Sequence, residues 1–286
     1  MQLRRSQEFV CSHRTSLFFA ATFTISWIGA FAVVAPRILR AEVIPNMAGI
    51  FMFPVMLLGP SLTGIVLTML ADGRSGLKDL VRRMGKVRLG PWYFGLLLPP
   101  CIISAVLFGL RILVSPAYTP NHFLMGISFG ILAGFLEEIG WMGFAFPALR
   151  STLRSAFVAA IVLGLLWGVW HLPVIDYLGT ATPHGSFLIP YLLTFIAVMT
   201  GMRVLIAWMY VNTTSVFCAQ LMHAGSTGFL VVLSPALVTA RQEVLWYGVY
   251  ALALWLVVAL VVLKYGVQLK ARTDSDNEHQ FSGKPI

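Results

Sequence analysis

The sequence is poor in charged residues and in cysteines, and each shortage excludes a class of protein. Only 11% of its 286 residues are charged and 58% are hydrophobic, and the mean hydropathy is +0.83, which excludes an ordinary soluble globular protein. The cysteines Cys11, Cys101 and Cys218 have no paired spacing, so neither a disulfide framework nor a thiolate metal site is indicated. The zinc motif H-E-x-x-H of soluble metalloproteases is also absent.

Apolar runs long enough to cross a bilayer, at about 20 residues each, dominate the chain. They cover residues 16–35, 47–71, 91–114, 123–148, 155–178, 187–209, 215–235 and 244–264. The sequence therefore predicts an all-α, polytopic bundle of about eight transmembrane helices. We expect residues 1–272 to form a single transmembrane domain and the polar residues 273–286 to be disordered.

The net charge of +9 comes from basic residues in the short segments between the apolar runs. They form no continuous patch, so no nucleic-acid partner is expected. Most of them fall on the side that holds both termini, and the positive-inside rule therefore predicts cytoplasmic termini. The basic connection 72–90 is expected to lie along the cytoplasmic headgroup surface. Short loops without a recognisable organelle-targeting segment indicate an integral protein of the bacterial cytoplasmic membrane.

Two adjacent carboxylates, Glu137 and Glu138, fall inside the run 123–148, where an unpaired charge is costly. Glu137 shares a helical face with a stripe of glycines at every fourth position, and such stripes let helices pack closely. Glu138 lies at the edge of that face. The alternative is that both side chains extend to the membrane surface.

Two histidines, His171 and His223, also lie on small-residue faces of their predicted helices. Together with Glu137 and Glu138 they could supply a base for water, a donor for an oxyanion and an acid for a leaving amine, as peptide hydrolysis requires. The same residue types suit a zinc site made by Glu137, His171 and His223, or a proton relay. Packing without chemistry is the remaining interpretation of each histidine.

Three ordered motifs resemble the CPBP family of CAAX-processing and bacteriocin-processing proteases, also called the Abi family. Residues 137–144 read EEIGWMGF, Trp167 precedes His171 by four residues, and His223 precedes Thr227 by four. The likeness covers about residues 91–230. It implies an intramembrane glutamic or metalloprotease that cleaves a membrane-associated peptide or protein.

By this resemblance Glu137 is the general base that activates water, assisted by His171. His223 and Thr227 stabilise the oxyanion, and Glu138 is a supporting carboxylate. A zinc ion is compatible with the family but is not specified by the motifs.

Two positions depart from the family pattern, since Met142 stands where arginine is usual and Thr227 where asparagine is common. Glu138 therefore lacks its usual i, i+4 ion-pair partner. Either another cation such as Arg203 replaces it, or Glu138 is protonated, or activity has been lost. A proton- or ion-coupled transporter and a non-catalytic scaffold derived from the protease family are the alternative functions.

The sequence finally predicts how the site is assembled. The side chains of Glu137, His171 and His223 should share one polar cavity, because each lies on the small-residue face of its helix. The cavity should be nearer the cytoplasmic face, because Glu137 is only thirteen residues before Arg150.

Overall fold

The computed structural model describes residues 8–45, 48–177, 184–235 and 238–271, and within these ranges it contains helices and no strand. The helices are α2 (Arg14–Leu39), α3 (Gly49–Met56), α4 (Leu58–Met84), α5 (Leu98–Leu113), α6 (Met125–Gly140), α7 (Phe146–Leu153), α8 (Ala156–Trp170), α9 (Leu188–Thr213), α10 (Val216–Leu233) and α11 (Ala240–Tyr265). A π turn, Trp141–Ala145, joins α6 to α7, and short 3-10 turns cover Gly90–Leu97, Ile175–Tyr177 and Gly185–Phe187. The all-α class is confirmed. The predicted disordered tail lies outside the described residues.

Seven helical segments within the described residues are long and apolar enough to cross a membrane, and α8 is a shorter apolar helix. The predicted run 155–178 is therefore wrong at its C-terminal end, because α8 stops at Trp170 with His171 as its C-cap. Pro173 follows closely, and proline cannot continue a helix. Fifteen residues span only about 22 Å, less than the ~30 Å hydrocarbon core. The chain that follows α8 therefore begins part of the way along the bundle and not at its end.

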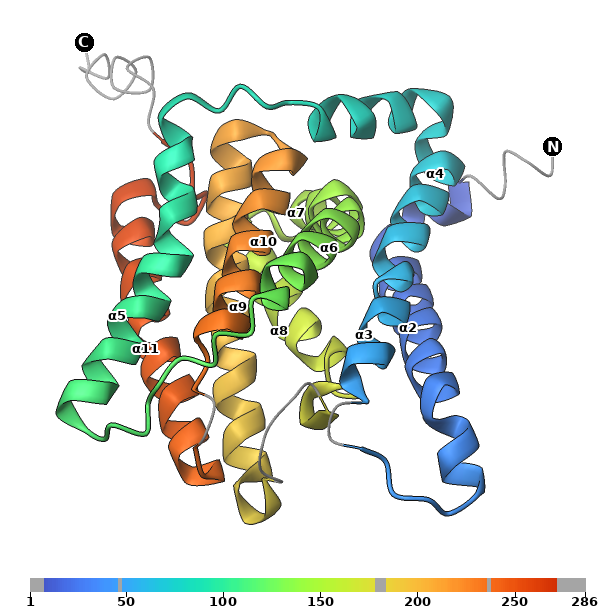
Figure 1. Cartoon of the computed structure of the whole chain (residues 1–286). Coiled ribbons are helices and arrows are strands. Elements are labelled where there is room, and N and C mark those ends of the chain that lie inside the picture. The colour runs from blue at the N-terminus through green and yellow to red at the C-terminus, as the bar shows by residue number, and fades with distance from the viewer. Residues whose placement is uncertain (1–7, 46–47, 178–183, 236–237, 272–286) are drawn as a thin grey trace, which may run out of the picture.

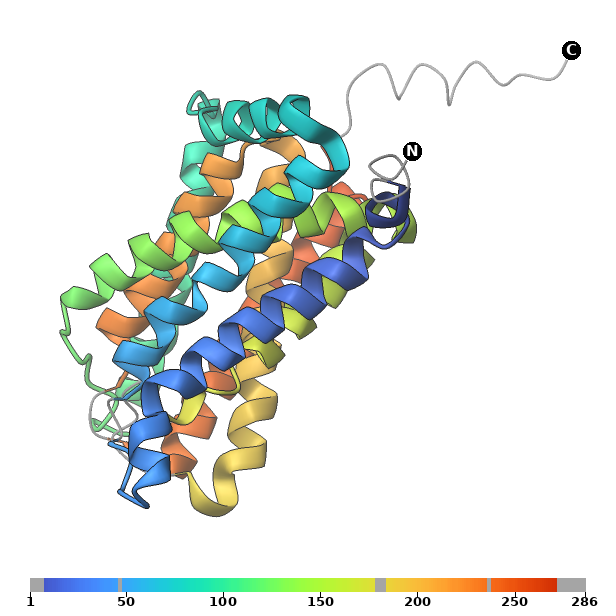
Figure 2. The same ribbon diagram turned by 90° about the vertical axis from the view of Figure 1, so that its right-hand side faces the viewer.

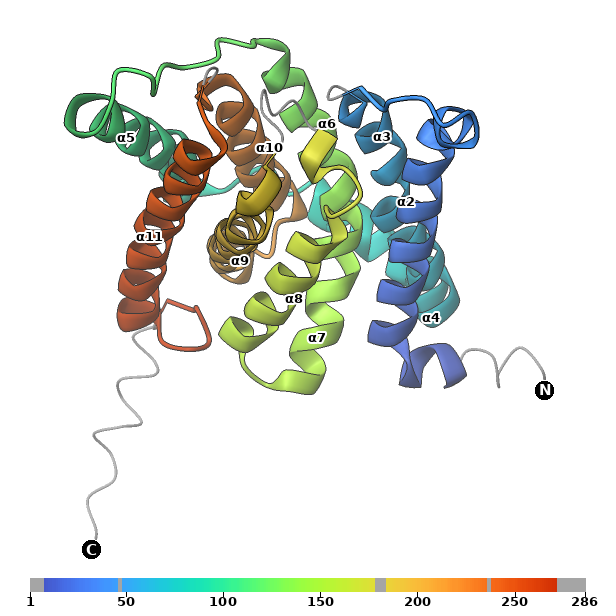
Figure 3. The same cartoon turned by 90° about the horizontal axis from the view of Figure 1, so that it is seen from below.

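The centre of the bundle is formed by α6, α8, α9 and α10 (Figure 3). Helices α5 and α11 lie on one side of this centre, and α2, α3 and α4 lie on the other (Figures 1 and 3). Helix α6 packs most extensively against α10 and also contacts α4, while α8 packs against α9. The residues predicted to carry the chemistry therefore lie on central helices.

The glycine stripe of α6 is the surface that packs against α10. A Cβ atom on Gly130 would lie 2.5 Å from the carbonyl oxygen of Ala224 and 2.7 Å from the Cα atom of Gly228. On α8, a Cβ on Gly164 would lie 2.7 Å from the Cα of Thr200 in α9. Both contacts need glycine, because any side chain would push the two helix backbones apart.

One end of the bundle carries the start of α2, the end of α11 and the last part of α4 (Figures 1 and 2). Helix α4 turns at Gly73, whose φ of 64° and ψ of −155° lie outside the helical region and favour glycine. Residues 74–84 then run across the end of the bundle (Figure 1). We call this the basic end, because most of the lysines and arginines lie there.

Candidate active site

Glu137 and Glu138 lie in the last turn of α6, directly before the π turn, and both are fully buried at 0% exposure. Successive residues of a helix point about 100° apart. Both can be buried because α6 has neighbours on several sides. Neither carboxylate reaches the membrane surface, so the interpretation that both extend to it is wrong.

Glu138 is held by an arginine and a histidine from two other helices. One guanidinium nitrogen of Arg203, Nη1 on α9, donates to both carboxylate oxygens at 2.7 and 2.8 Å. The Nδ1 atom of His223 on α10 lies 2.7 Å from Oε1 of Glu138. A carboxylate paired with arginine accepts hydrogen bonds, so Nδ1 of His223 is the donor and its Nε2 is left with a lone pair. Glu138 thereby fixes the orientation of the His223 ring.

The position of Arg203 accounts for the departure at Met142. Met142 is completely buried among apolar neighbours, and the positive charge beside Glu138 comes from α9 instead of α6. Arg203 is itself fully buried, and its guanidinium lies 4.0 Å from the centre of the Trp167 ring, a cation–π contact. Of the three explanations for the missing arginine, the structure supports the first, because Arg203 is a replacement cation beside Glu138.

Glu137 has one occupied and one open carboxylate oxygen. Its Oε2 accepts hydrogen bonds from the indole nitrogens of Trp141 at 2.9 Å and Trp167 at 2.7 Å. Its Oε1 is buried without a hydrogen-bond partner among the side chains that the structure describes, and it lies 4.0 Å from Nε2 of His223. A buried acceptor without a partner is costly, so Oε1 is where a water or substrate proton would be bound.

His171 caps the C-terminus of α8, and its Nδ1 lies 2.8 Å from the carbonyl oxygen of Trp167. Because a carbonyl only accepts, Nδ1 carries the proton and Nε2 keeps a lone pair. His171 and Thr227 both line a pocket of about 380 Å³. Thr227 lies one helical turn after His223 on α10.

The pocket is mostly apolar and is bounded by several helices. Its lining includes the aromatic and aliphatic residues Phe53, Phe123, Phe129, Trp167, Tyr191, Phe195, Leu230 and Tyr247. Glu137, Glu138 and His223 do not line it. Trp167 lies between the two groups, since its ring contacts both His171 and His223 and its N–H donates to Glu137. The prediction of one shared polar cavity is therefore wrong. His171 lines the pocket, whereas Glu137 and His223 do not, and Trp167 contacts all three residues.

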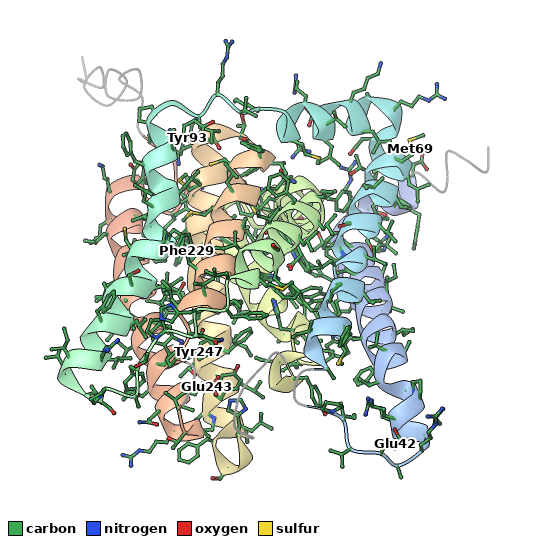
Figure 4. The ribbon with its side chains drawn as sticks, in the orientation of Figure 1. Glu42, Met69, Tyr93, Phe229, Glu243 and Tyr247 are labelled. Atoms are coloured by element: carbon green, nitrogen blue, oxygen red, sulfur yellow. The ribbon has the colours of Figure 1, made fainter. Side chains whose placement is uncertain are left out.

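The pocket lies toward the end of the bundle opposite the basic end. Its lining residues Glu243 and Tyr247 lie on the same side as Glu42, whereas Met69 and Tyr93 mark the basic end (Figure 4). The pocket is thus not at the basic end, where the prediction placed it, and this contradicts the predicted topology, the predicted mechanism, or both. That expectation counted residues from Glu137 to Arg150, but α8 ends early and leaves space on the other side of the glutamates.

The described residues contain no group of three or more His, Cys, Asp or Glu side chains arranged to hold a metal ion. The predicted set of Glu137, His171 and His223 does not form one, because the Trp167 ring stands between His171 and the other two. The residues as placed do not fit a zinc ion, and the mechanism below includes no metal.

Two indole donors to Glu137 were not assigned a role from the sequence. Trp141 follows Glu137 by four residues and so shares its helical face, which is a signal the sequence contains. Trp167 matches the motif as an aromatic residue. Only the structure shows that its N–H, on α8, donates a hydrogen bond to Glu137 on α6.

Comparison with known proteins agrees with the motifs. Residues 118–229 match the family model for type II CAAX prenyl endopeptidase Rce1-like proteins. The chain is 27% identical over 277 residues to a CAAX prenyl protease 2 of Methanococcus maripaludis, which covers 88% of this chain and 94% of the relative. Neither finding favours the transporter or the scaffold alternative. With these two likenesses and the three ordered motifs, this integral membrane protein is similar to the CAAX-type endopeptidases of the CPBP family.

Proposed function

We propose that this protein hydrolyses a peptide bond of a membrane-anchored, prenylated protein, using water that Glu137 activates. The observation that carries the proposal is the open Oε1 atom of Glu137, which faces Nε2 of His223 behind an apolar pocket. A carboxylate with a free acceptor atom in a water-poor site is suited to remove a proton from water.

In the proposed reaction, Oε1 of Glu137 takes one proton as the water oxygen attacks the scissile carbonyl carbon. The carbonyl electron pair moves to its oxygen and gives a tetrahedral oxyanion. When this collapses, the carbon–nitrogen bond breaks and the proton passes to the leaving nitrogen. The new carboxylic acid then gives its proton to the amine, so the products are a carboxylate and an ammonium group. His171 assists from the pocket side, where its Nε2 lone pair can orient the attacking water.

His223 and Thr227 supply the charge stabilisation in this scheme. With Nδ1 bonded to Glu138, the His223 ring can take a second proton at Nε2, and the resulting imidazolium is stabilised by the adjacent carboxylate. Its Nε2–H and the Thr227 hydroxyl are the two proposed donors to the oxyanion. Glu138 and Arg203 act through His223 and are positioning residues.

Access to Glu137 requires the Trp167 indole to move, because it separates the base from the pocket. Substrate entering the pocket would shift the ring enough to open a path to Oε1, while the indole N–H stays bonded to Oε2 of Glu137. This closed arrangement keeps bulk water away from the base until substrate is present.

The apolar lining of the pocket suits the isoprenoid group that the name of the archaeal relative indicates for that protein. We place the protein in the bacterial cytoplasmic membrane, which agrees with its short loops. The pocket then supplies lipid recognition, and the groups around Trp167 supply the chemistry.

The test is cleavage by purified protein of a peptide that ends in a prenylated CAAX sequence, with product masses read by mass spectrometry. Removal of the residues after the prenylated cysteine is expected, with kcat/KM at least tenfold higher than for the same peptide without the prenyl group. The His223→Gln variant, purified in the same way, should be inactive. Equal cleavage of both peptides would contradict the proposed substrate class, and no cleavage of either would contradict the proposed activity.

A further inference from the structure

The segment 74–84 begins where the apolar surface of α4 ends. Met69 and Leu70 are exposed at 43% and 51%, as side chains in contact with lipid would be, and the chain turns at Gly73 three residues later. Met69 lies next to this turn (Figure 4). The segment after the turn therefore lies at the level of the lipid headgroups.

The outer face of this segment is basic. Arg74, Lys78 and Arg82 are spaced by four residues, so they lie within about 80° of one another around the helix. All three are exposed, and nitrogen-tipped side chains project from the segment away from the bundle (Figure 4). Val81, 66% exposed, lies beside them and adds an apolar edge, as in helices that lie in the headgroup region.

The inner face of the same segment rests on the π turn next to the candidate active site. Arg83 donates to the carbonyl oxygen of Gly143 at 2.9 Å and to the hydroxyl of Tyr210 at 2.8 Å. Leu80 is 2% exposed and packs so closely that a Cβ on Gly143 would lie 2.7 Å from its Cδ1 atom. The same turn contains Trp141, which donates to Glu137.

We propose that the basic face of Arg74, Lys78 and Arg82 binds anionic phospholipid headgroups, and that this binding stabilises the π turn beside Glu137. Charge complementarity identifies the ligand, since Arg74, Lys78 and Arg82 give this face a positive charge at headgroup level although Arg82 also pairs with Asp79. Each such residue contributes a roughly fivefold gain in affinity for an anionic surface. The contacts of Arg83 and Leu80 with Gly143 connect the bound helix to the turn.

Lipid binding is measured by native mass spectrometry of the full chain in detergent, titrated with phosphatidylglycerol or phosphatidylcholine. We expect phosphatidylglycerol to bind preferentially, with an affinity at least tenfold weaker after Arg74→Gln, Lys78→Gln and Arg82→Gln are combined. The matched control neutralises three exposed basic residues at the opposite end of the bundle, Arg37, Arg40 and Arg241. An equal loss in both triple variants, or no loss in the first, would overturn the proposed surface.

Coupling to the π turn is measured by hydrogen–deuterium exchange over residues 139–147. Exchange should slow at least twofold when phosphatidylglycerol is added to the wild-type protein, and it should not change in the variant that lacks the basic face. Unchanged exchange in the wild type would overturn the coupling. Neither readout depends on peptide cleavage, so failure here is distinguishable from failure of the proposed function.

Discussion

Arg203 is the residue on which the buried charges of the site depend. It is fully buried, and it is the charged partner of Glu138. Breaking a buried ion pair by removing one partner leaves an uncompensated charge, which costs about 3–5 kcal/mol. Because Glu138 also holds His223, the loss would disturb the ring that faces Glu137.

We therefore expect Arg203→Met to lower the stability of the protein and to reduce kcat for peptide cleavage at least a hundredfold. Adding Met142→Arg should restore part of both, because an arginine at 142 lies four residues after Glu138, in the π turn that follows α6. Met142→Leu is the control for a change of size without charge. Thermal unfolding and steady-state kinetics measure the two effects. Full activity of the Arg203→Met variant would show that Glu138 needs no cation.

Trp167 contributes a hydrogen bond to Glu137 in addition to its ring. Trp167→Phe keeps an aromatic wall and removes the N–H that donates to Oε2 at 2.7 Å. A hydrogen bond to a charged group contributes about 1.5–3 kcal/mol, so kcat should fall about tenfold or more. Trp255→Phe is the matched control, because it removes an indole N–H that donates to the Ala197 carbonyl away from the site. Equal kcat values for the two variants would contradict the role of Trp167.

At the scale of single residues, the sequence identified the ionisable groups but not their contacts. The motifs named Glu137, Glu138 and His223, and the missing arginine at Met142 pointed to Arg203 as a replacement. That Trp167 separates His171 from the other groups depends on how α8 is placed relative to α6 and α10, which helical periodicity does not encode.

At the scale of helices, small-residue stripes predicted which faces are buried but not which helices meet. The glycines of α6 pack on α10, and Gly164 of α8 packs on α9. The early end of α8 was missed, because apolar residues beyond Trp170 continue the hydrophobic run although the helix stops. The π turn carries no local composition signal.

Close packing of α6 on α10 should be sensitive to a single methyl group. Gly130→Ala places a Cβ 2.5 Å from the Ala224 carbonyl oxygen, and such overpacking costs about 1–3 kcal/mol. We expect a lower melting temperature in detergent and reduced activity, since α10 carries His223. Gly109→Ala is the control, because nothing lies within 4 Å of a Cβ there and alanine favours the helix. Equal melting temperatures for the two variants would contradict the close helix contact.

At the scale of the whole molecule, the basic residues and the pocket lie at opposite ends of the bundle (Figure 4). The positive-inside rule assigns the basic end to the cytoplasm. A pocket at the opposite end contradicts this predicted topology, the predicted mechanism, or both, and which side of the membrane it faces is decided by experiment. The sequence could not show this, because the position of a pocket depends on the packing of six helices.

Cysteine accessibility measures this arrangement in intact cells. The background variant has Cys11, Cys101 and Cys218 replaced by serine. Ser75→Cys then places a single cysteine in the segment 74–84 at the basic end, and Asn121→Cys places one in the lining of the pocket. A membrane-impermeant thiol reagent should label the cysteine at 121 in intact cells, and the cysteine at 75 only after the membrane is opened. Labelling in the reverse order would show that the pocket faces the cytoplasm.

The most direct measurement of the proposed chemistry is the rate of cleavage of a prenylated CAAX peptide by Glu137→Gln. Glutamine keeps the shape of the side chain but cannot take a proton from water, so we predict that kcat falls by about a hundred- to ten-thousand-fold with an unchanged melting temperature. Glu42→Gln changes an exposed glutamate far from the site and should retain the wild-type rate. Cleavage by Glu137→Gln at the wild-type rate would contradict the assignment of Glu137 as the base.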